Sequence, residues 1–412
     1  MAEAKQFDFL NVVNHRIAIG NVAVDDLVGK YGSPLFAYVA DSIRSRISII
    51  KDAIKYPRLN ISYAVRANPS LAILRMLYRE GMTATAASAG EVMSAFKVGF
   101  APHNILAIAD LLTDSEMEFC HDRNVQLSFG SCDALERFGT HHREQKIVLR
   151  ASPGESTVEG RAWNDVYGFK PDSLDEAEKR VKEYGLRVTG VHACDSVETT
   201  DAARIIERLD AVFGAAKRFE DVTYINIGGG LGVAMRKSDA ELDIYGVGEV
   251  VTKRMNEHAA SSRRSVTLVV EPGRYLVADA GFLFMKVIAK RLHGGVQKVV
   301  TDASTHLLSD LRFGDRYYEI INATNPDGAP SAIVIAGCAT DSGDIFTQEP
   351  REIAEVRPGD ILAIRSAGAY AMALAGVFNM RPRPAEVMLE EGRERLIRRR
   401  ETIDDLLRNQ DW

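Results

Sequence analysis

The sequence predicts an α/β protein in which a parallel (β/α)8 barrel of the TIM type is followed by a β-rich C-terminal domain. The chain has 412 residues, more than one ordinary core organises, so two domains are expected. From residue 61 to about 275, short β-branched runs alternate with helical patterns, and eight such units in roughly 215 residues match a parallel barrel. After about residue 280 the pattern changes to strands and turns.

Periodic helical segments separate the predicted barrel strands. Pro69 stands at the start of one helix and Gly81 at its end, while Ser173 is a plausible cap and Gly185 the end of another. The predicted strands are, in order, ISYAV, TATAA, ILAIA, VQLSF, KIVLRA, RVTGVHA, TYINIG and SVTLVVE.

Outside the barrel, the sequence predicts one β domain built from both ends of the chain. We expect residues 1–39, including the extended PLFAYVA, to join residues 276–412, and residues 40–275 to form the barrel. The charged tail from Glu390 to Trp412 predicts a helix with a solvated face or a partner contact. The predicted strands after the barrel are GFLFMKVIAKRL, KVVTDAS, YYEIINA, SAIVIAG and ILAIRSAGAYA, with NPDG as a turn signal.

Composition and charge exclude several classes of protein. A hydrophobic fraction of 46% is typical of globular chains, and a net charge of −6 offers no basic face for nucleic acid. The start of the chain lacks a basic region followed by an apolar run, and no apolar stretch reaches the roughly 18 residues of a membrane span. The scattered cysteines predict a reduced, cytoplasmic protein without disulfides or a cysteine-built zinc site; they are Cys120, Cys132, Cys194 and Cys338.

Candidate functional residues lie where the predicted barrel strands end, because working groups in such barrels follow the C-terminal ends of the strands. The glycines Gly228, Gly229, Gly230 and Gly232 let backbone amides face an anion, and a phosphate is the natural ligand. The other residues at strand ends are Arg66, Ser88, His192, Cys194 and Glu271.

Seven motifs span nearly the whole chain: SPLFAYVADSIRSRI, YAVRANPSLAILRMLYREG, SAGEV, INIGGGLGV, EPGRYLVADAG, TDSGDIF and GAYAMALAGVFNMRPRPAEV. In order and spacing they resemble the fold type III pyridoxal phosphate (PLP) decarboxylases, which include diaminopimelate and ornithine decarboxylases. The resemblance implies the alanine racemase/ornithine decarboxylase-like fold. It also implies a PLP-carrying barrel whose site is completed by the β domain across a head-to-tail homodimer acting on a small amino-acid-like substrate.

The resemblance also implies roles for individual residues. Gly228, Gly229 and Gly230 match the phosphate loop, and Glu271 matches the acid that pairs with the pyridine nitrogen and keeps the ring an electron sink. Ser88 and Tyr370 match cofactor-binding positions.

Substrate binding is assigned by the same resemblance. Arg274 matches an arginine near the phosphate and the substrate, and Arg312 resembles one that binds the substrate carboxylate. Asp341 and Asp344 lie in the segment donated by the partner subunit, where one of them would receive a substrate ammonium.

One departure from the family pattern concerns the covalent anchor. The family's YAVKAN supplies the lysine that forms a Schiff base with PLP, whereas this chain has Arg66. A guanidinium stays protonated, with a pKa above about 12, and has no amine lone pair to add to an aldehyde. We therefore expect no internal aldimine. In an empty site, we expect Arg66 to pair with Glu271 across the barrel mouth.

Other departures affect proton transfer. The histidine that stacks on the cofactor in the family falls on Cys194, although a two-residue slip would place His192 there. Thr85 replaces an aspartate, and Thr340 replaces a cysteine that donates a proton. A hydroxyl is a far weaker acid than a thiol, so ordinary protonation would be compromised.

Three interpretations follow. The first is a decarboxylase-like enzyme with altered chemistry that binds PLP noncovalently, without a structural or catalytic metal. The second is a noncatalytic dimeric homologue or regulator, favoured by the clustered losses. In the third, haem replaces PLP and is ligated by Cys194, although a small buried cysteine is the commoner meaning of such a residue.

Overall fold

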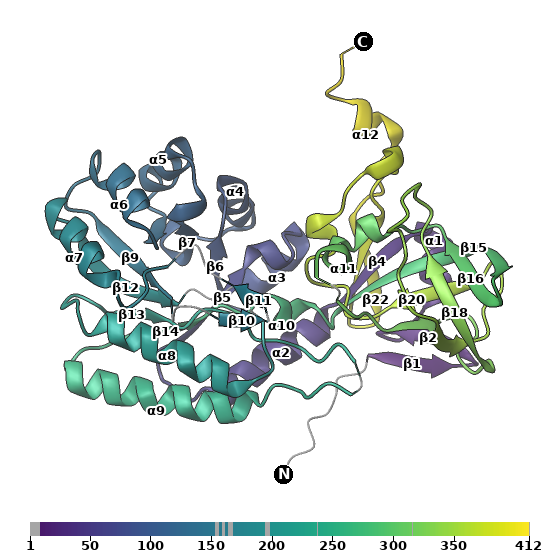
Figure 1. Ribbon diagram of the computed structural model, residues 1–412, viewed down its shortest axis with the longest axis horizontal. Helices are drawn as coiled ribbons and strands as arrows, with labels where there is room; N and C mark the ends of the chain where they lie inside the picture. The colour runs from purple at the N-terminus through teal and green to yellow at the C-terminus, as the bar shows by residue number, and fades with distance from the viewer. Residues whose placement is uncertain are drawn as a thin grey trace. The chain divides into compact units, whose positions relative to one another are not determined.

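The chain folds into two compact units, shown as ribbons in Figure 1. This computed structural model describes residues 9–152, 156–158, 161–163, 168–193, 198–236, 238–314 and 316–411. The barrel unit comprises Ser48–Ala234 and Ala240–Tyr275. The β unit comprises Met1–Ile47, Met235–Asp239 and Leu276–Trp412.

The barrel unit contains a closed parallel barrel, which confirms the predicted fold class. Neighbouring strands follow the order β12-β13-β14-β5-β6-β7-β8-β9, so the last strand in the chain closes on the first. Each predicted strand is present: β5 (Leu59–Ala64), β6 (Thr83–Ala86), β7 (Ile105–Ile108), β8 (Gln126–Phe129), β9 (Lys146–Ala151), β12 (Arg187–Ala193), β13 (Tyr224–Asn226) and β14 (Thr267–Val270).

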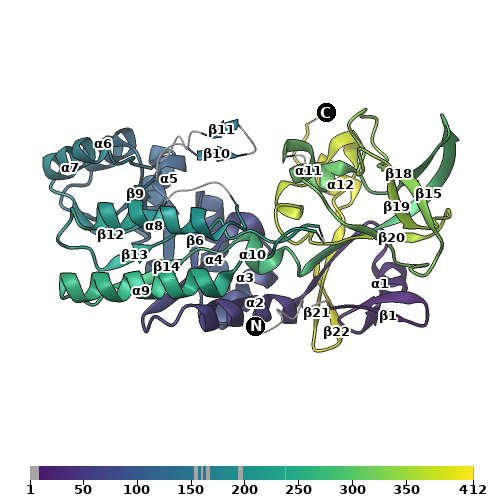
Figure 2. The ribbon, with the colours of Figure 1, turned by 60° about the horizontal axis from the view of Figure 1, so that its bottom comes forward.

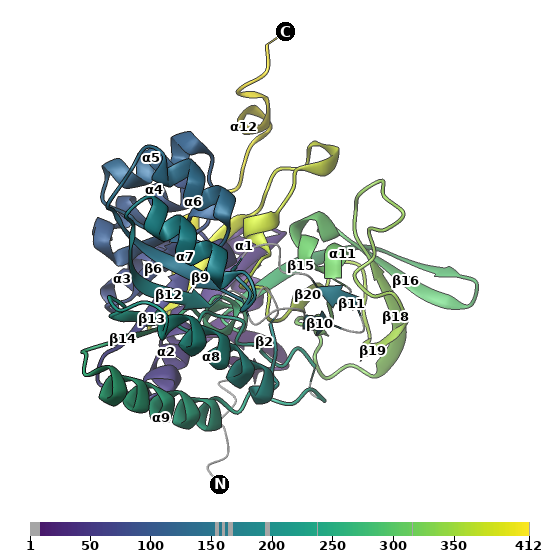
Figure 3. The same cartoon turned by 60° about the vertical axis from the view of Figure 1, so that its left-hand side comes forward.

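Helices cover the outside of the barrel strands, as Figure 3 shows. Local sequence fixes their ends: the Ser88 side chain caps α4, which stops at the left-handed Gly99, and Thr113 with Glu116 forms a capping box at α5. The helices between strands are α3 (Leu71–Arg79), α4 (Ala89–Val98), α5 (Asp114–Asp122), α6 (Cys132–Gly139), α7 (Leu174–Glu183), α8 (Ala202–Ala216) and α9 (Ile244–Ser262). α2 (Ala40–Ala53) precedes β5, and α10 (Arg274–Val277) follows β14.

The β unit is organised by a sheet of nine strands within the described residues. The N-terminal strand β4 (Leu35–Val39) pairs antiparallel with β15 and parallel with β21, so the last part of the opening segment belongs to this sheet. The other strands are β15 (Gly281–His293), β16 (Val296–Thr301), β17 (Ile320–Asn322), β18 (Pro330–Ala336), β19 (Arg351–Ala354), β20 (Ile361–Ile364), β21 (Ala385–Glu390) and β22 (Arg393–Arg398).

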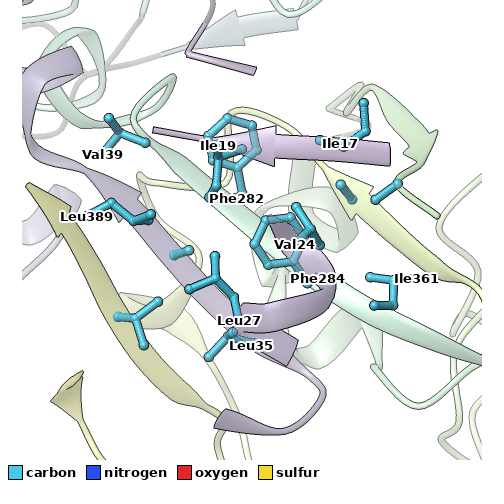
Figure 4. Packing of buried hydrophobic residues seen from close by; sticks show 14 of the residues in the cluster. Ile17, Ile19, Val24, Leu27, Leu35, Val39, Phe282, Phe284, Ile361 and Leu389 are labelled. Carbon is cyan, nitrogen blue, oxygen red and sulfur yellow. The ribbon is translucent and has the colours of Figure 1, made fainter. Parts of the chain in front are cut away.

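A hairpin sheet and the short helix α1 (Val24–Tyr31) cover one face of the large sheet. The hairpin sheet consists of β1 (Leu10–Val13), β2 (Arg16–Ile19) and β3 (Val22–Ala23). Figure 4 shows Ile19 and Leu27 packed with Leu35, Phe282 and Phe284. Alternate residues of β4 and β15 thus build the apolar core of the β unit.

The end of the chain is a strand followed by a short helix. The tail prediction was wrong in its first part, because Arg393–Arg398 pairs with β21 as β22 and only Ile403–Leu407 is helical, as α12. The alternation of RERLIR suits a strand at the sheet margin, and the turn Glu391–Gly392 with positive φ starts it.

In the described part of the chain, no helix combines the length and apolar character needed to cross a bilayer.

Candidate cofactor and active site

A buried carboxylate, Glu271, lies directly after β14 at the C-terminal end of the barrel, and its side chain is 3% exposed. Thr85 Oγ1 donates a hydrogen bond to Glu271 Oε1 (2.6 Å), and Asn226 Nδ2 donates to the same oxygen (2.5 Å). His192 Nε2 lies 3.1 Å from Oε2. Three different strands therefore direct donors at one carboxylate.

The hydrogen bonds continue across the barrel interior. Because Thr85 gives its proton to Glu271, its oxygen accepts from Ser62 Oγ at 2.9 Å. His192 Nδ1 lies 3.0 Å from Ser128 Oγ. All of these side chains are buried and come from β5, β6, β8, β12 and β13, so the barrel mouth contains one connected polar network around Glu271.

Burial alone would raise the pKa of Glu271, because it disfavours the charged form. The opposing effects are larger: attraction to His192, hydrogen bonds from His192 and Thr85, and the positive charge of Arg66 hold the pKa at about 2. Glu271 is therefore an anion at any physiological pH, as a partner of a protonated pyridine nitrogen must be.

The glycine loop after β13 lies against this carboxylate. Gly228 and Gly230 have φ of +73° and +68°, a region in which other residues are strained. A Cβ on Gly229 would lie 2.2 Å from the Glu271 carbonyl oxygen, so only glycine fits there. The Gly228 amide donates to Asn226 Oδ1 (2.8 Å), and buried Arg208 donates to the Gly229 carbonyl (2.8 Å). The loop is a cradle fixed from both sides.

Arg66 occupies a short 3-10 turn, Val65–Ala67, directly after β5 and is half-buried. Its charge acts on Glu271, and it also opposes the burial that raises the pKa of Glu91. The structure therefore brings Arg66 into electrostatic reach of Glu271, while a direct ion pair between them stays a prediction.

Two other predicted residues of the barrel unit have defined partners. Arg274, which is 3% exposed, forms a close ion pair with Glu198. The Ser88 hydroxyl accepts from the Glu91 backbone amide (3.2 Å) as the cap of α4. Their roles toward a ligand stay predictions.

In the β unit, Asp341 and Arg312 form an ion pair of 2.6 Å, and His306 Nε2 lies 3.4 Å from the same carboxylate. A backbone hydrogen bond from Gly343 and the Arg312 side chain hold the pKa of Asp341 below its usual value. The acid, in the loop after β18, and the arginine, in the short helix α11 (Ser309–Gly314), are thus brought together.

The remaining predicted residues of the β unit lie in different surroundings. Buried Asp344 accepts from the amides of Thr305 and Ala339 (both 2.7 Å) and from two hydroxyls, so it organises its own loop. The Thr340 hydroxyl is exposed and bonds with the Asn379 side chain (2.9 Å). Tyr370 adopts a positive φ of 55°.

Cys194 lies outside the described residues, so the structure gives no support to haem ligation there. The sequence interpretation missed Asn226, Ser128 and Ser62, and it treated Thr85 only as a lost aspartate. The available signal was polarity, because each of the four is a polar residue between apolar or aromatic neighbours in a short strand.

We predict that Glu271→Gln lowers stability at neutral pH by about 1–3 kcal/mol, because an amide NH2 would face donors from Thr85 and Asn226. Since the folded pKa of Glu271 (about 2) lies below the unfolded value of about 4.3, its contribution is complete above the unfolded value and is lost as pH falls toward 2. Urea unfolding between pH 7 and 2 measures both effects.

The control is Glu257→Gln, on the exposed face of α9, which should leave the pH dependence as in the unmodified chain. Equal acid sensitivity of the unmodified and Glu271→Gln proteins would contradict an ionised, hydrogen-bonded Glu271.

Known proteins resemble this chain in sequence and in structure. Residues 40–278 match the family model described as "Pyridoxal-dependent decarboxylase, pyridoxal binding domain". The diaminopimelate decarboxylase of Methanothermobacter thermautotrophicus is 30% identical, covering 96% of this chain and 95% of that protein. The Escherichia coli K12 diaminopimelate decarboxylase is 29% identical, covering 92% and 94%.

Solved structures agree with this similarity. The diaminopimelate decarboxylase of M. jannaschii superimposes with a TM-score of 0.89 at 25% identity, covering 98% of both chains. The Helicobacter pylori diaminopimelate decarboxylase, solved in complex with L-lysine, gives a TM-score of 0.84 at 26% identity, covering 93% of this chain and 98% of that one. With its barrel, its anionic Glu271 and its glycine cradle, the chain belongs to the family of pyridoxal-dependent decarboxylases.

Proposed function

We propose that this chain binds PLP noncovalently and acts as a decarboxylase-like lyase with altered chemistry on a small amino-acid-derived substrate. The observation that carries the proposal is the ionised Glu271, which receives three donors beside a glycine loop that tolerates no side chain at Gly229. A buried anion is costly, and a protonated heterocycle is a ligand that would use it.

The residues present fit most of the cofactor. The amides of Gly229 and Gly230 would hold the phosphate, because the Gly228 amide already donates to Asn226 Oδ1, and Glu271 would pair with the protonated ring nitrogen. When bound, PLP supplies an electron sink for the negative charge that remains after CO2 is lost. Asn226 and Thr85 keep Glu271 oriented, so the carboxylate needs no rearrangement to accept a cation.

Arg66 does not fit the covalent part of the family pattern. A guanidinium has no amine to attach a cofactor and no proton to exchange near neutral pH. It places a permanent positive charge near Glu271 and Glu91 instead. Cofactor affinity must then come from Glu271 and the glycine loop, and any proton movement must use other groups, such as His192.

For the substrate, we propose that a carboxylate binds Arg312 and that a separate ammonium binds Asp341. Their 2.6 Å ion pair supports the pairing, because a zwitterionic ligand could replace each partner with its own opposite charge. Of the two candidate acids, Asp341 is favoured over Asp344, whose oxygens already accept four hydrogen bonds.

A noncatalytic binding protein is the second candidate, and Arg66 is the observation that favours it. With no amine at position 66, a retained cofactor or substrate site could serve regulation alone. Measuring CO2 release from a panel of amino acids with PLP present separates the two candidates. An enzyme releases CO2 from at least one of them, and a noncatalytic binding protein releases it from none.

The central test is the absorbance of the purified chain with added PLP, followed by borohydride reduction and intact-mass measurement. We predict the band of a free aldehyde and an unchanged protein mass, because Arg66 cannot form a Schiff base. Arg66→Lys should gain an imine band and one reduced PLP adduct.

Arg75→Lys, at an exposed position on α3, is the matched control and should gain no adduct. A covalent adduct at the active site of the unmodified chain, or an Arg66→Lys protein with no affinity for PLP, would overturn the proposal.

We predict that Asp341→Ala weakens binding of a diamino acid such as lysine by about tenfold or more, since a charge-assisted bond is worth roughly 1.5–3 kcal/mol. Binding of an amino acid without a second amine should change little. Calorimetry with both ligands on the PLP-loaded protein measures the difference. If diamino acids bind Asp341→Ala as well as the unmodified chain, the assignment is wrong.

We propose that the chain is a homodimer, in which the segment containing Asp341 completes the site of the second copy, as the resemblance implies. Exposed apolar side chains on the neighbouring segment support an interface: Leu374, Val377, Phe378 and Met380 are 39–46% exposed. Asn379 in this segment bonds to Thr340, which ties the two segments together.

Light scattering at micromolar concentration should give twice the chain mass, and Phe378→Glu should give the monomer. Leu292→Glu, which changes an exposed apolar side chain on the separate strand β15, is the control and should leave the dimer intact. A monomer that binds PLP and substrate with full affinity would refute the dimeric site.

A further inference from the structure

A cluster of potential metal ligands lies on the outer layer of the barrel unit, in the helices rather than at the strand ends. Glu118 and His121 belong to α5, and His142 lies in the turn after α6. Figure 2 shows α5 and α6 as neighbouring helices. One ligand atom from each of the three side chains lies within 4.8 Å of the other two.

Local structure fixes these side chains on a common face. Glu118 and His121 are three residues apart, so they are neighbours on one side of α5, which its capping box anchors. The His142 amide donates to the Phe138 carbonyl (2.9 Å), which holds the turn after α6. Glu-x-x-His on one helix, completed by a residue from the next element, is an arrangement that binds metals in other helical proteins.

The two imidazole rings of the cluster lie against each other. The rings of His121 and His142 lie with centroids 3.9 Å apart, and both contact Phe138. Neutral imidazole is the form that ligates a metal.

A second observation also points to a ligand. His121 Nδ1 is buried, and among the described residues it has no hydrogen-bond partner; the nearest carboxylate oxygen, Asp122 Oδ1, is 4.0 Å away. A buried polar atom without a partner is costly, and a metal ion is one way to satisfy the cluster. Beside it, His142 Nε2 lies 2.6 Å from Glu118 Oε2.

We propose that Glu118, His121 and His142 bind a single zinc ion. Two imidazole nitrogens and a carboxylate oxygen are zinc ligands, and water can complete the coordination because Glu118 is 52% exposed. Tetrahedral bonds of about 2.0–2.1 Å require ligand atoms about 3.4 Å apart. The three ligand atoms now lie within 4.8 Å of one another, so rotation of these partly exposed side chains would bring them to the required separation.

Metal binding displaces the proton on Nε2 of His142. To bind zinc through Nε2, His142 must give up the proton that Nε2 shares with Glu118. In a neutral ring this proton moves to Nδ1, and from a charged ring it leaves to solvent. The bound ion would tie α5 to the turn after α6 and stabilise the outer layer of the barrel.

The test is equilibrium dialysis of the full-length, chelator-treated protein against Zn2+, with metal analysis of the protein. We expect the unmodified chain to bind one more zinc than His121→Ala or His142→Ala, and Glu118→Gln to weaken this binding about tenfold or more. His141→Ala is the matched control, because His141 is exposed, adjacent and outside the cluster.

Circular dichroism of the metal-free variants checks their folding, and Glu118→Gln, at a half-exposed position, keeps the test valid if a histidine variant unfolds. Zinc should also raise the thermal midpoint of the unmodified chain and of His141→Ala, and should raise that of Glu118→Gln by less. Equal zinc content in the unmodified chain and the folded cluster variants would overturn the proposal, as would equal loss in His141→Ala.

Discussion

The barrel unit depends on how it accommodates one buried negative charge, that of Glu271. Removing a carboxylate from water costs several kcal/mol unless donors replace its hydration. Here Thr85, Asn226 and His192 supply those donors from three strands, and Ser62 and Ser128 hold two of the donors in place. Hydrogen bonds to Glu271, as well as packing, therefore constrain the positions of the strand ends.

The same constraint shapes the glycine loop. The loop passes so close to the Glu271 backbone that Gly229 cannot carry a Cβ, and Asn226 links the loop to the carboxylate by bonding to both. The glycine loop and the buried acid are thus parts of one structure. These parts are joined through Asn226, and Arg66 follows a different strand, β5, so we propose that the chain can bind the cofactor without attaching it covalently.

Much of the fold could be predicted because burial imposes periodicity. The eight strand runs were short, β-branched and regularly interrupted, and all eight are present. The tail from Arg393 was mistaken for a helix because its charges suggested a solvated helix, whereas pairing with β21 decided its conformation. Tertiary pairing of this kind is not visible in local charge.

The site was predictable only in part for a similar reason. Motif resemblance located Glu271, the glycines and Arg66, yet the partners of Glu271 come from strands more than 30 residues apart along the chain. Asn226 lies in the INIGGGLGV motif, but nothing in the motif links it to Glu271, and Ser128 belongs to no motif. Only barrel closure brings Asn226 to the carboxylate and Ser128 to His192. The pairing of Asp341 with Arg312 and the saturation of Asp344 also depend on loop conformation that spacing does not specify.

The central claim is that Glu271 is an anion poised to bind a protonated ring nitrogen although position 66 offers no covalent anchor. The most direct measurement is the 15N NMR spectrum of PLP labelled at its ring nitrogen and bound to the unmodified chain. Our account predicts a protonated nitrogen near neutral pH, and a neutral one in Glu271→Gln. A bound cofactor with a neutral nitrogen in the unmodified chain, or a spectrum showing only free PLP at saturating protein, would contradict it.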